Sequence, residues 1–258
     1  MPVFSLFSAA YRAARRMGLL RTRPGSSLFI ASYFAYKRHL EDPFDKLSRH
    51  PHWFRGGHLI DAGANIGYCS ALFSRLIDPE YKVFAFEPEA ENFALLQRVI
   101  RKQTRSTVHA TQAALGAFNG QIGLCLNPKH HGDHRVSETG PADQMVPLIS
   151  LDTFLEERGA MTPVRLIKID VQGYELAVCR GAVRTLERNP DCIVVLEYMP
   201  EALKALGVDP PELLAWFGQR GYQVDTLRRD GHISAGFSGE IPARGYVDLV
   251  FSRSGQLA

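Results

Sequence analysis

The sequence predicts an α/β fold built on a mostly parallel sheet of seven strands, flanked by helices and ended by an antiparallel pair. From residue 58 onward, short runs rich in β-branched and aromatic residues alternate with helical stretches, a pattern typical of a doubly wound parallel sheet. The final strand-like runs, 222–227 and 246–251, are joined by about eighteen residues without room for a crossover helix. These two runs are therefore expected to pair antiparallel at the edge of the sheet.

The first half of this sheet is predicted to contain three strands, at 58–62, 81–86 and 107–110. A helix is expected at 67–77, where Asp78-Pro79 ends it, because a residue before proline is disfavoured in helical conformation. A second helix follows Pro88 and carries apolar residues at helical spacing, namely Phe93, Leu96, Val99 and Ile100.

Residues 116–150 interrupt this alternation. Glycines and prolines surround two short strand-like runs, 121–126 and 145–149, so the segment is predicted to be an inserted hairpin with a long polar loop. Directly afterwards, Asp152 is the expected N-cap of a short helix.

The second half of the sheet resumes with a strand at 165–171 and a helix at 175–187, which Asn189-Pro190 ends. The run 192–198 is almost entirely apolar, which favours a central strand covered on both faces. Pro210-Pro211 opens one more helix, closed by Gly221.

Length and composition fit one α/β domain over residues 58–258 of the 258-residue chain. A net charge of +3 is too small to favour nucleic acid as a partner. The four cysteines lack CxxC spacing, which favours a reducing, cytoplasmic location. No run of eighteen apolar residues is present, so no membrane-spanning segment is predicted.

Residues 1–57 are predicted to form a helical, basic extension. Residues 1–40 contain seven arginines and lysines and no acidic residue. An amphipathic helix over about 4–20 has two interpretations. In the first, residues 4–23 contact a membrane surface or dock an acceptor. In the second, the helix packs on the domain and leaves its basic face in solvent.

A glycine-containing turn, Asp61 to Gly67, follows the first strand, and Glu87 follows the second about 20 residues later. Glycines let the backbone turn tightly against a nucleotide, and an acid at the next strand end accepts hydrogen bonds from ribose hydroxyls. The carboxylate of Asp61 would repel a pyrophosphate but suits a ligand with an amine and a positively charged sulfur. Residues 113–115 are candidates for an apolar contact with an adenine ring.

A second motif spans 166–175, where an apolar strand delivers Asp170 to its carboxyl end. Ligands of open α/β sheets bind outside the carboxyl ends of the strands, so Asp170 is expected on the same edge as Asp61 and Glu87. The alternative is a helix-capping Asp170, with Lys168 paired to a neighbouring carboxylate.

The runs DAGANIGYCSALFS, FEPEAEN and IKIDVQGYE resemble the FkbM family of S-adenosylmethionine-dependent methyltransferases over about residues 58–252. The resemblance implies a Rossmann-like class I methyltransferase fold and S-adenosylmethionine as methyl donor. It also implies O-methylation of a hydroxyl on a sugar, glycolipid or polyketide-like natural product. Gln172 stands where the family commonly has Glu, which leaves the role of that position open.

The expected cofactor contacts are Asp61, Gly63, Ala64, Asn65, Gly67, Glu87, Pro88, Ala114 and Asp170. Asp170 is the first candidate base or acceptor-orienting acid for an alcohol nucleophile, and Glu197 is the second. Glu197 is alternatively a structural partner of Lys168. Residues His131, Arg135, Lys168 and Glu175 are candidates to bind a small-molecule or saccharide acceptor.

The polar loop 130–135 supplies His134 as a further candidate base. The loop is alternatively plain surface. A metal ion bound by this loop is the weaker alternative, because no second cluster of ligands occurs elsewhere in the sequence. A divalent ion bound by Asp170 and Glu197 is disfavoured by the geometry that such a site requires. No metal site is predicted.

Two other functions stay open. Methylation of an amino group on nucleic acid is disfavoured because residues 170–173 lack the Pro-Pro-aromatic sequence which that chemistry usually presents. A non-catalytic cofactor-binding or scaffold protein, docking through the basic N-terminus, is the alternative from another class. Oligomeric state is not predicted.

Overall fold

The main sheet carries the architecture. The computed structural model describes residues 13, 17–41, 44–103, 107–127, 134–138 and 140–253. Within these residues, eight strands form one sheet in the order β11-β10-β12-β9-β8-β1-β2-β3. The strands are β1 (His58–Ala62), β2 (Val83–Phe86), β3 (Val108–Thr111), β8 (Val164–Ile169), β9 (Ile193–Tyr198), β10 (Gln223–Leu227), β11 (Ile233–Ser234) and β12 (Val247–Ser252).

The predicted seven-stranded, mostly parallel sheet is confirmed, with one refinement at its end. Strands β3, β2, β1, β8 and β9 pair in parallel. Strand β12 lies between β9 and β10 and pairs antiparallel with both, so the predicted antiparallel pair is β10–β12. The short strand β11 adds one further antiparallel pairing beyond β10.

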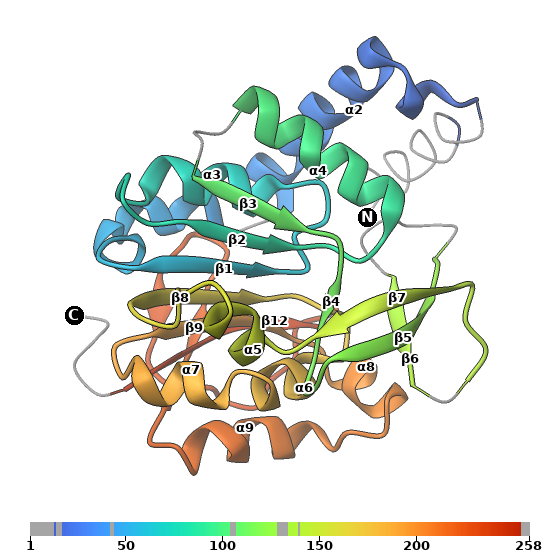
Figure 1. Cartoon of the computed structure of the whole chain (residues 1–258). Helices are drawn as coiled ribbons and strands as arrows, with labels where there is room; N and C mark the ends of the chain where they lie inside the picture. Colours follow the sequence, from blue (N-terminus) through green and yellow to red (C-terminus); the bar gives the residue numbers. More distant parts are fainter. Residues whose placement is uncertain are drawn as a thin grey trace.

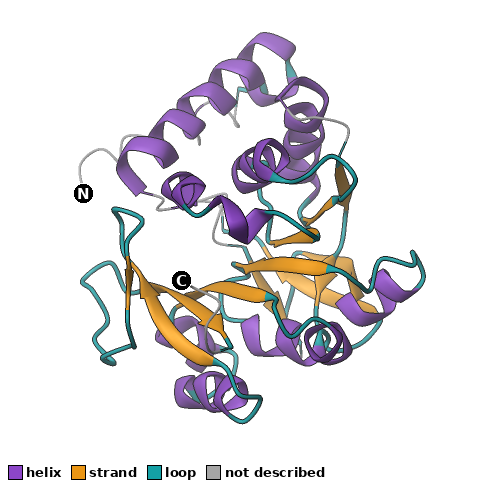
Figure 2. Ribbon diagram, turned by 90° about the vertical axis from the view of Figure 1, so that its left-hand side faces the viewer, coloured by secondary structure: helices purple, strands orange, loops and turns teal. Residues whose placement is uncertain are grey.

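Helices cover both faces of this sheet (Figures 1 and 2). On one face lie α2 (Arg23–Tyr36), α3 (Tyr68–Leu76) and α4 (Ala90–Gln103). The other face carries α5 (Leu151–Glu156), α6 (Glu175–Arg180), α7 (Val183–Arg188), α8 (Pro200–Ala205) and α9 (Pro210–Gly218). Each layer buries its own apolar cluster against the sheet, which gives the three-layer, Rossmann-like arrangement.

Two local expectations on the second face are wrong. The helix expected at 175–187 is split into α6 and α7, because Gly181 packs against the inserted segment. A Cβ at Gly181 would lie 1.9 Å from the Gly116 carbonyl oxygen. Ser150, not Asp152, caps α5 by accepting from the Thr153 N–H at 3.2 Å. Asp152 instead accepts from the Thr185 N–H at 2.8 Å, in the first turn of α7.

The inserted segment forms a second, smaller sheet. Its described strands are β4 (Ala114–Leu115), β5 (Gly120–Cys125), β6 (Arg135–Ser137) and β7 (Gln144–Ile149), in the order β4-β7-β5-β6. The expected hairpin is the antiparallel pair β5–β7, and β6 adds a strand where only a loop was expected. Figure 1 shows this sheet beside the carboxyl ends of β1, β2 and β3.

The described part of the N-terminal extension packs onto the core. It contains η1 (Leu19–Arg21), α2, the π-helical turn η2 (Lys37–Glu41) and the 3-10 turns η3 (Phe44–Arg49) and η4 (Pro51–Phe54). Phe29, Ile30 and Tyr33 of α2 are buried in the same cluster as α3 and α4. The division of the chain at residue 57 therefore stays a prediction.

The predicted amphipathic helix over residues 4–20 lies mostly outside the described residues. In the part of the chain that the structure describes, no helix is long and apolar enough to cross a membrane.

Candidate active site

The glycine turn after β1 is shaped by a close approach to the segment after β8. Gly63 has a φ of 73°, and a Cβ on it would lie 1.9 Å from the carbonyl oxygen of Asp170. Only glycine fits both the backbone angle and the space. The two strand ends are thereby brought together at the carboxyl edge of the sheet.

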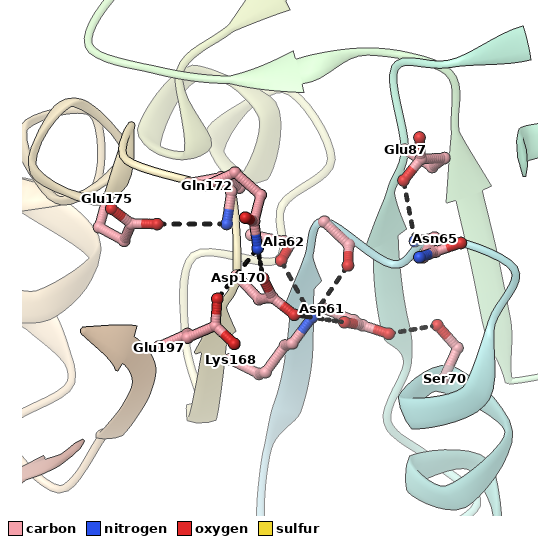
Figure 3. A network of polar contacts seen from close by, with 12 residues as sticks. Asp61, Ala62, Asn65, Ser70, Glu87, Lys168, Asp170, Gln172, Glu175 and Glu197 are labelled. Carbon is pink, nitrogen blue, oxygen red and sulfur yellow. Dashed lines mark hydrogen bonds and ion pairs between the residues drawn. The ribbon is translucent and has the colours of Figure 1, made fainter. Parts of the chain in front are cut away.

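Lys168 joins the two strand ends electrostatically (Figure 3). Its ammonium lies 3.3 Å from Asp61 Oδ1 and 3.5 Å from Asp170 Oδ2, and it donates to the Gly63 carbonyl oxygen at 2.9 Å. The second oxygen of Asp61 accepts a 2.6 Å hydrogen bond from the Ser70 hydroxyl of α3. This lysine is buried, so its ion pair with the equally buried Asp61 is shielded from water.

Two residues predicted as ligand contacts, Asp61 and Lys168, do not line the cleft. Asp61 is 0% exposed and points toward α3, so it does not line the neighbouring cleft. Lys168 is also buried, and its nitrogen is engaged by the carboxylates and carbonyls of the two strand ends. Of the alternatives weighed for Lys168, pairing with neighbouring carboxylates is the one observed. Both residues serve to hold the strand ends together.

A cleft opens beside the glycine turn, and Glu87 lines it. The Glu87 carboxylate accepts from the Asn65 N–H at 2.8 Å and from the Glu89 N–H at 3.0 Å. Burial raises the pKa of Glu87 to about 7, although both of these hydrogen bonds oppose the shift. Other lining residues that were predicted are Gly63, Asn65, Pro88, Ala114, His134 and Asp170.

The cleft also offers an apolar surface and an unpartnered acceptor. Phe86, Ala113 and Leu115 line it together with Ala114. The side-chain oxygen of Asn65 is buried and has no hydrogen-bond partner among the described residues. A ligand with an apolar ring and a cationic donor would fit these features.

Two residues of the turn have backbone roles instead. Ala64 is buried, and its N–H donates to the Phe86 carbonyl oxygen at 2.8 Å. Gly67 has a φ of 92° and abuts α4, because a Cβ there would lie 2.7 Å from Leu96 Cδ1. Neither residue lines the cleft.

Asp170 belongs to a second group of side chains, across the cleft from Glu87. Gln172 donates through one nitrogen to Asp170 Oδ1 at 3.0 Å and to Glu197 Oε2 at 2.9 Å (Figure 3). Asp170 keeps 33% of its side chain exposed and lines the cleft. Burial raises the pKa of Glu197 well above its ordinary range, and the charges of Asp170 and Asp248 add to this shift.

Glu175 does not face an acceptor, contrary to the expectation. It is 1% exposed and accepts from the Gly173 N–H at 3.0 Å and the Val171 N–H at 3.4 Å. These bonds fix a loop in which both Gln172 and Gly173 have positive φ, at 55° and 106°. Burial raises the pKa of Glu175 to about 7. Its role is therefore to shape the loop that presents Asp170 and Gln172.

The inserted sheet closes the cleft with His134. Its Nδ1 accepts from the Asn127 N–H at 3.0 Å, so a neutral ring carries its proton on Nε2. This arrangement favours a hydrogen-bond donor over the base that was predicted. Arg135 is half-buried in β6 and does not line the cleft, while His131 lies outside the described residues.

Three contributors were missed from the sequence. Asn92 and Tyr174 line the cleft, and the Tyr174 hydroxyl donates to Glu138 at 2.8 Å. Lys37 of η2 lies close enough for its charge to oppose the rise in the pKa of Glu197. Tyr174 lies inside the IDVQGYE run and could have been suspected, whereas nothing near Lys37 in the sequence signals its position. Among the described residues, no group of three metal-binding side chains occurs.

Comparison with known proteins identifies the family of this chain. The model of the methyltransferase FkbM domain matches residues 61–224. "Methyltransferase 1" of Beauveria bassiana is 29% identical over 143 residues, which cover 48% of this chain and 57% of that protein. "Hexuronic acid methyltransferase AglP" of Haloferax volcanii is 30% identical over 177 residues, covering 67% of this chain and 66% of that protein.

Among solved structures, methyltransferase FkbM from Methylobacillus flagellatus has the same fold. It has a TM-score of 0.51 and 18% identity, with 84% of this chain and 50% of that chain covered. The matched region spans less than two thirds of each of these relatives. Since the family match extends over more than half of the chain and includes the glycine turn, Glu87 and Asp170, this protein belongs to the FkbM methyltransferase family.

Proposed function

We propose that the protein transfers the methyl group of S-adenosylmethionine to a hydroxyl of a saccharide. The observation that carries the proposal is one cleft with Glu87 at the end of β2 and Asp170 just beyond β8, separated by the glycine turn. The relative AglP is named for methylation of a hexuronic acid, which supports a sugar as the acceptor class.

The lining of the cleft suits the cofactor. Glu87 has a carboxylate that can accept from two ribose hydroxyls, and the apolar residues beside it suit an adenine ring. The free side-chain oxygen of Asn65 can accept from the ammonium of the methionine portion. When bound, S-adenosylmethionine supplies a methyl group already activated by its positive sulfur.

The chain's own contribution is to position and deprotonate the acceptor. Asp170 is exposed to the cleft, and Lys168 and Gln172 hold its two oxygens in place. A carboxylate fixed in this way can accept the proton of an acceptor hydroxyl as it attacks. Glu197 does not line the cleft, and burial raises its pKa and so favours the protonated form, which cannot accept a proton. We therefore assign the base to Asp170.

Calorimetric titration with S-adenosylhomocysteine tests the cofactor site. We expect the wild type to bind, and Glu87→Gln to bind on the order of tenfold to a hundredfold more weakly, because a charged acceptor is lost. Glu80→Gln, at an exposed turn, is the matched control and should bind as the wild type does. A wild type that binds no S-adenosylhomocysteine would refute the proposal.

A transfer assay with labelled S-adenosylmethionine tests the base. Asp170→Asn should keep its affinity for S-adenosylhomocysteine within about threefold and lose on the order of a hundredfold in methyl transfer to a saccharide. Unchanged transfer by this variant would remove Asp170 from the role of base.

A further inference from the structure

A second hollow lies at the same edge of the main sheet, beyond β9. It is formed by the end of β10, the start of β12 and the segment 228–246 between them. We call it the arginine groove, after Arg228, Arg229 and Arg244, which line it. Neither the predicted acceptor residues nor the cleft beside Glu87 includes any part of it.

The arginine groove adjoins the group around Asp170 through the strand order. Strand β12 pairs with β9, so that Asp248 lies opposite Glu197 and Val247 lies opposite Tyr198. Val247 lines the groove. Adjacent strands are about 4.8 Å apart, so the groove begins roughly 10 Å from β8, the strand that ends just before Asp170. An acceptor longer than one small ring can therefore reach both places.

Phe237 lines the groove and contacts the end of β9. Its ring contacts that of Tyr198 edge-on, with centroids 5.6 Å apart. A flat ring in the groove can pack against the C–H face of a sugar. Asp230 and Glu240 in the same lining supply acceptors for sugar hydroxyls.

Arg244 is held in a fixed position at the groove. Its Nε donates to the Tyr246 carbonyl oxygen at 3.0 Å, and its Nη2 lies 3.2 Å from Asp248 Oδ2. The guanidinium carbon also lies 4.2 Å from the centre of the Tyr246 ring. The remaining nitrogen, Nη1, is buried and has no hydrogen-bond partner among the described residues. An anionic oxygen of a ligand would satisfy it after a small movement of the side chain.

We propose that the arginine groove binds the part of the acceptor remote from the methylated hydroxyl, and that Arg244 recognises an anionic group there. The acceptor is then an acidic saccharide. This inference rests on the proposed function. It specifies in addition that the acceptor is negatively charged and that Arg244 binds the charged group. A carboxylate or a phosphate carries the required chemistry, because a guanidinium matches both.

Ligand-observed NMR on the protein saturated with S-adenosylhomocysteine tests the groove with three probes: methyl β-D-glucuronide, methyl β-D-glucoside and glucose 1-phosphate. We expect at least one anionic probe to bind on the order of tenfold more tightly than the neutral glucoside. The tighter of the two anionic probes identifies the anionic group. Equal binding of all three, or binding of none, overturns the inference.

Variants locate the binding. Arg244→Gln should weaken binding of the preferred anionic probe on the order of tenfold without changing the affinity for S-adenosylhomocysteine. Arg229→Gln, in the same groove, gives a second test should Arg244→Gln fold poorly, and should weaken the probe by a few-fold.

Arg220→Gln is the matched control, because Arg220 does not line the groove. Its guanidinium carbon lies 3.9 Å from the centre of the Trp216 ring. Full affinity in both groove variants would overturn the inference while binding of S-adenosylhomocysteine left the proposed function intact. Failure of the wild type to bind S-adenosylhomocysteine would instead refute the proposed function.

Discussion

The ends of β1 and β8 carry two aspartates that share one lysine yet differ in what surrounds them. Asp61 is 0% exposed and is held by Lys168 and Ser70. Asp170 pairs with the same lysine, but 33% of its side chain is exposed to the cleft. A carboxylate at a strand end therefore stabilises the fold or stays accessible to a ligand, depending on the direction in which its side chain points. Asp61 points at a helix, and Asp170 points into the cleft.

The largest effect is expected from removing the shared cation. Lys168→Met leaves Asp61 buried without its counter-charge, which should lower the free energy of unfolding by about 4 kcal/mol. Urea denaturation at pH 7 measures it. Lys204→Met is the control, because its ion pair with Glu201 is exposed, and it should cost well under 1 kcal/mol. Similar losses in the two variants would show that the buried pair is not structural.

The second prediction concerns the pH dependence of stability at Glu175, the residue that shapes the loop before α6. The folded-state pKa of Glu175 is raised from 4.5 to about 7, so stability present below pH 4.5 is lost as the pH rises through 7. Glu175→Gln stays neutral and should exceed the wild type by about 3 kcal/mol at pH 8, but match it near pH 4.5. Urea denaturation at both pH values checks this. A difference independent of pH would contradict the assignment.

Glu87 should instead show its pH dependence in ligand binding. With the cofactor bound as proposed, its ribose hydroxyls would donate to the ionised carboxylate, so affinity for S-adenosylhomocysteine should be constant above pH 7 and fall below it. The fall is at most about tenfold per pH unit. Calorimetry between pH 5.5 and 8.5, values chosen to bracket the pKa of about 7, follows it. Glu87→Gln should give a flat profile, and an equally steep fall in that variant would assign the titration elsewhere.

The smallest effect is expected at Gln172, whose amide bridges two carboxylates. Gln172→Glu replaces the amide that bridges Asp170 and Glu197 with a third carboxylate. The free energy of unfolding should fall by about 1 kcal/mol at pH 8, and by less at pH 5, where protonation relieves the repulsion. Equal stability at both pH values would mean that the bridge contributes little to holding Asp170.

The sequence was sufficient to predict which residues lie at the ends of the strands that form the site. Asp61, Glu87 and Asp170 each follow an apolar run, and parallel strands bring their carboxyl ends to one edge. The sequence could not tell which side chains turn inward. That depends on partners distant in the chain, as for Asp61 and Lys168, which are 107 positions apart in the numbering.

The departures elsewhere have similar causes. The additional strand β11 pairs with β10, and its two residues are too few to show a strand pattern in the sequence. The arginine groove was not predicted because its residues are spread over a connecting segment without a motif. The break at Gly181 reflects the approach of the inserted sheet, which is remote in sequence.

Unfolding of the two aspartate variants, measured side by side, tests the central distinction most directly. Asp61→Asn removes the buried partner of Lys168 and should lower the free energy of unfolding by about 3 kcal/mol. Asp170→Asn changes a partly exposed carboxylate and should cost less than about 1 kcal/mol. Equal losses, or a greater loss for Asp170→Asn, would contradict the division between a structural and a reactive strand end.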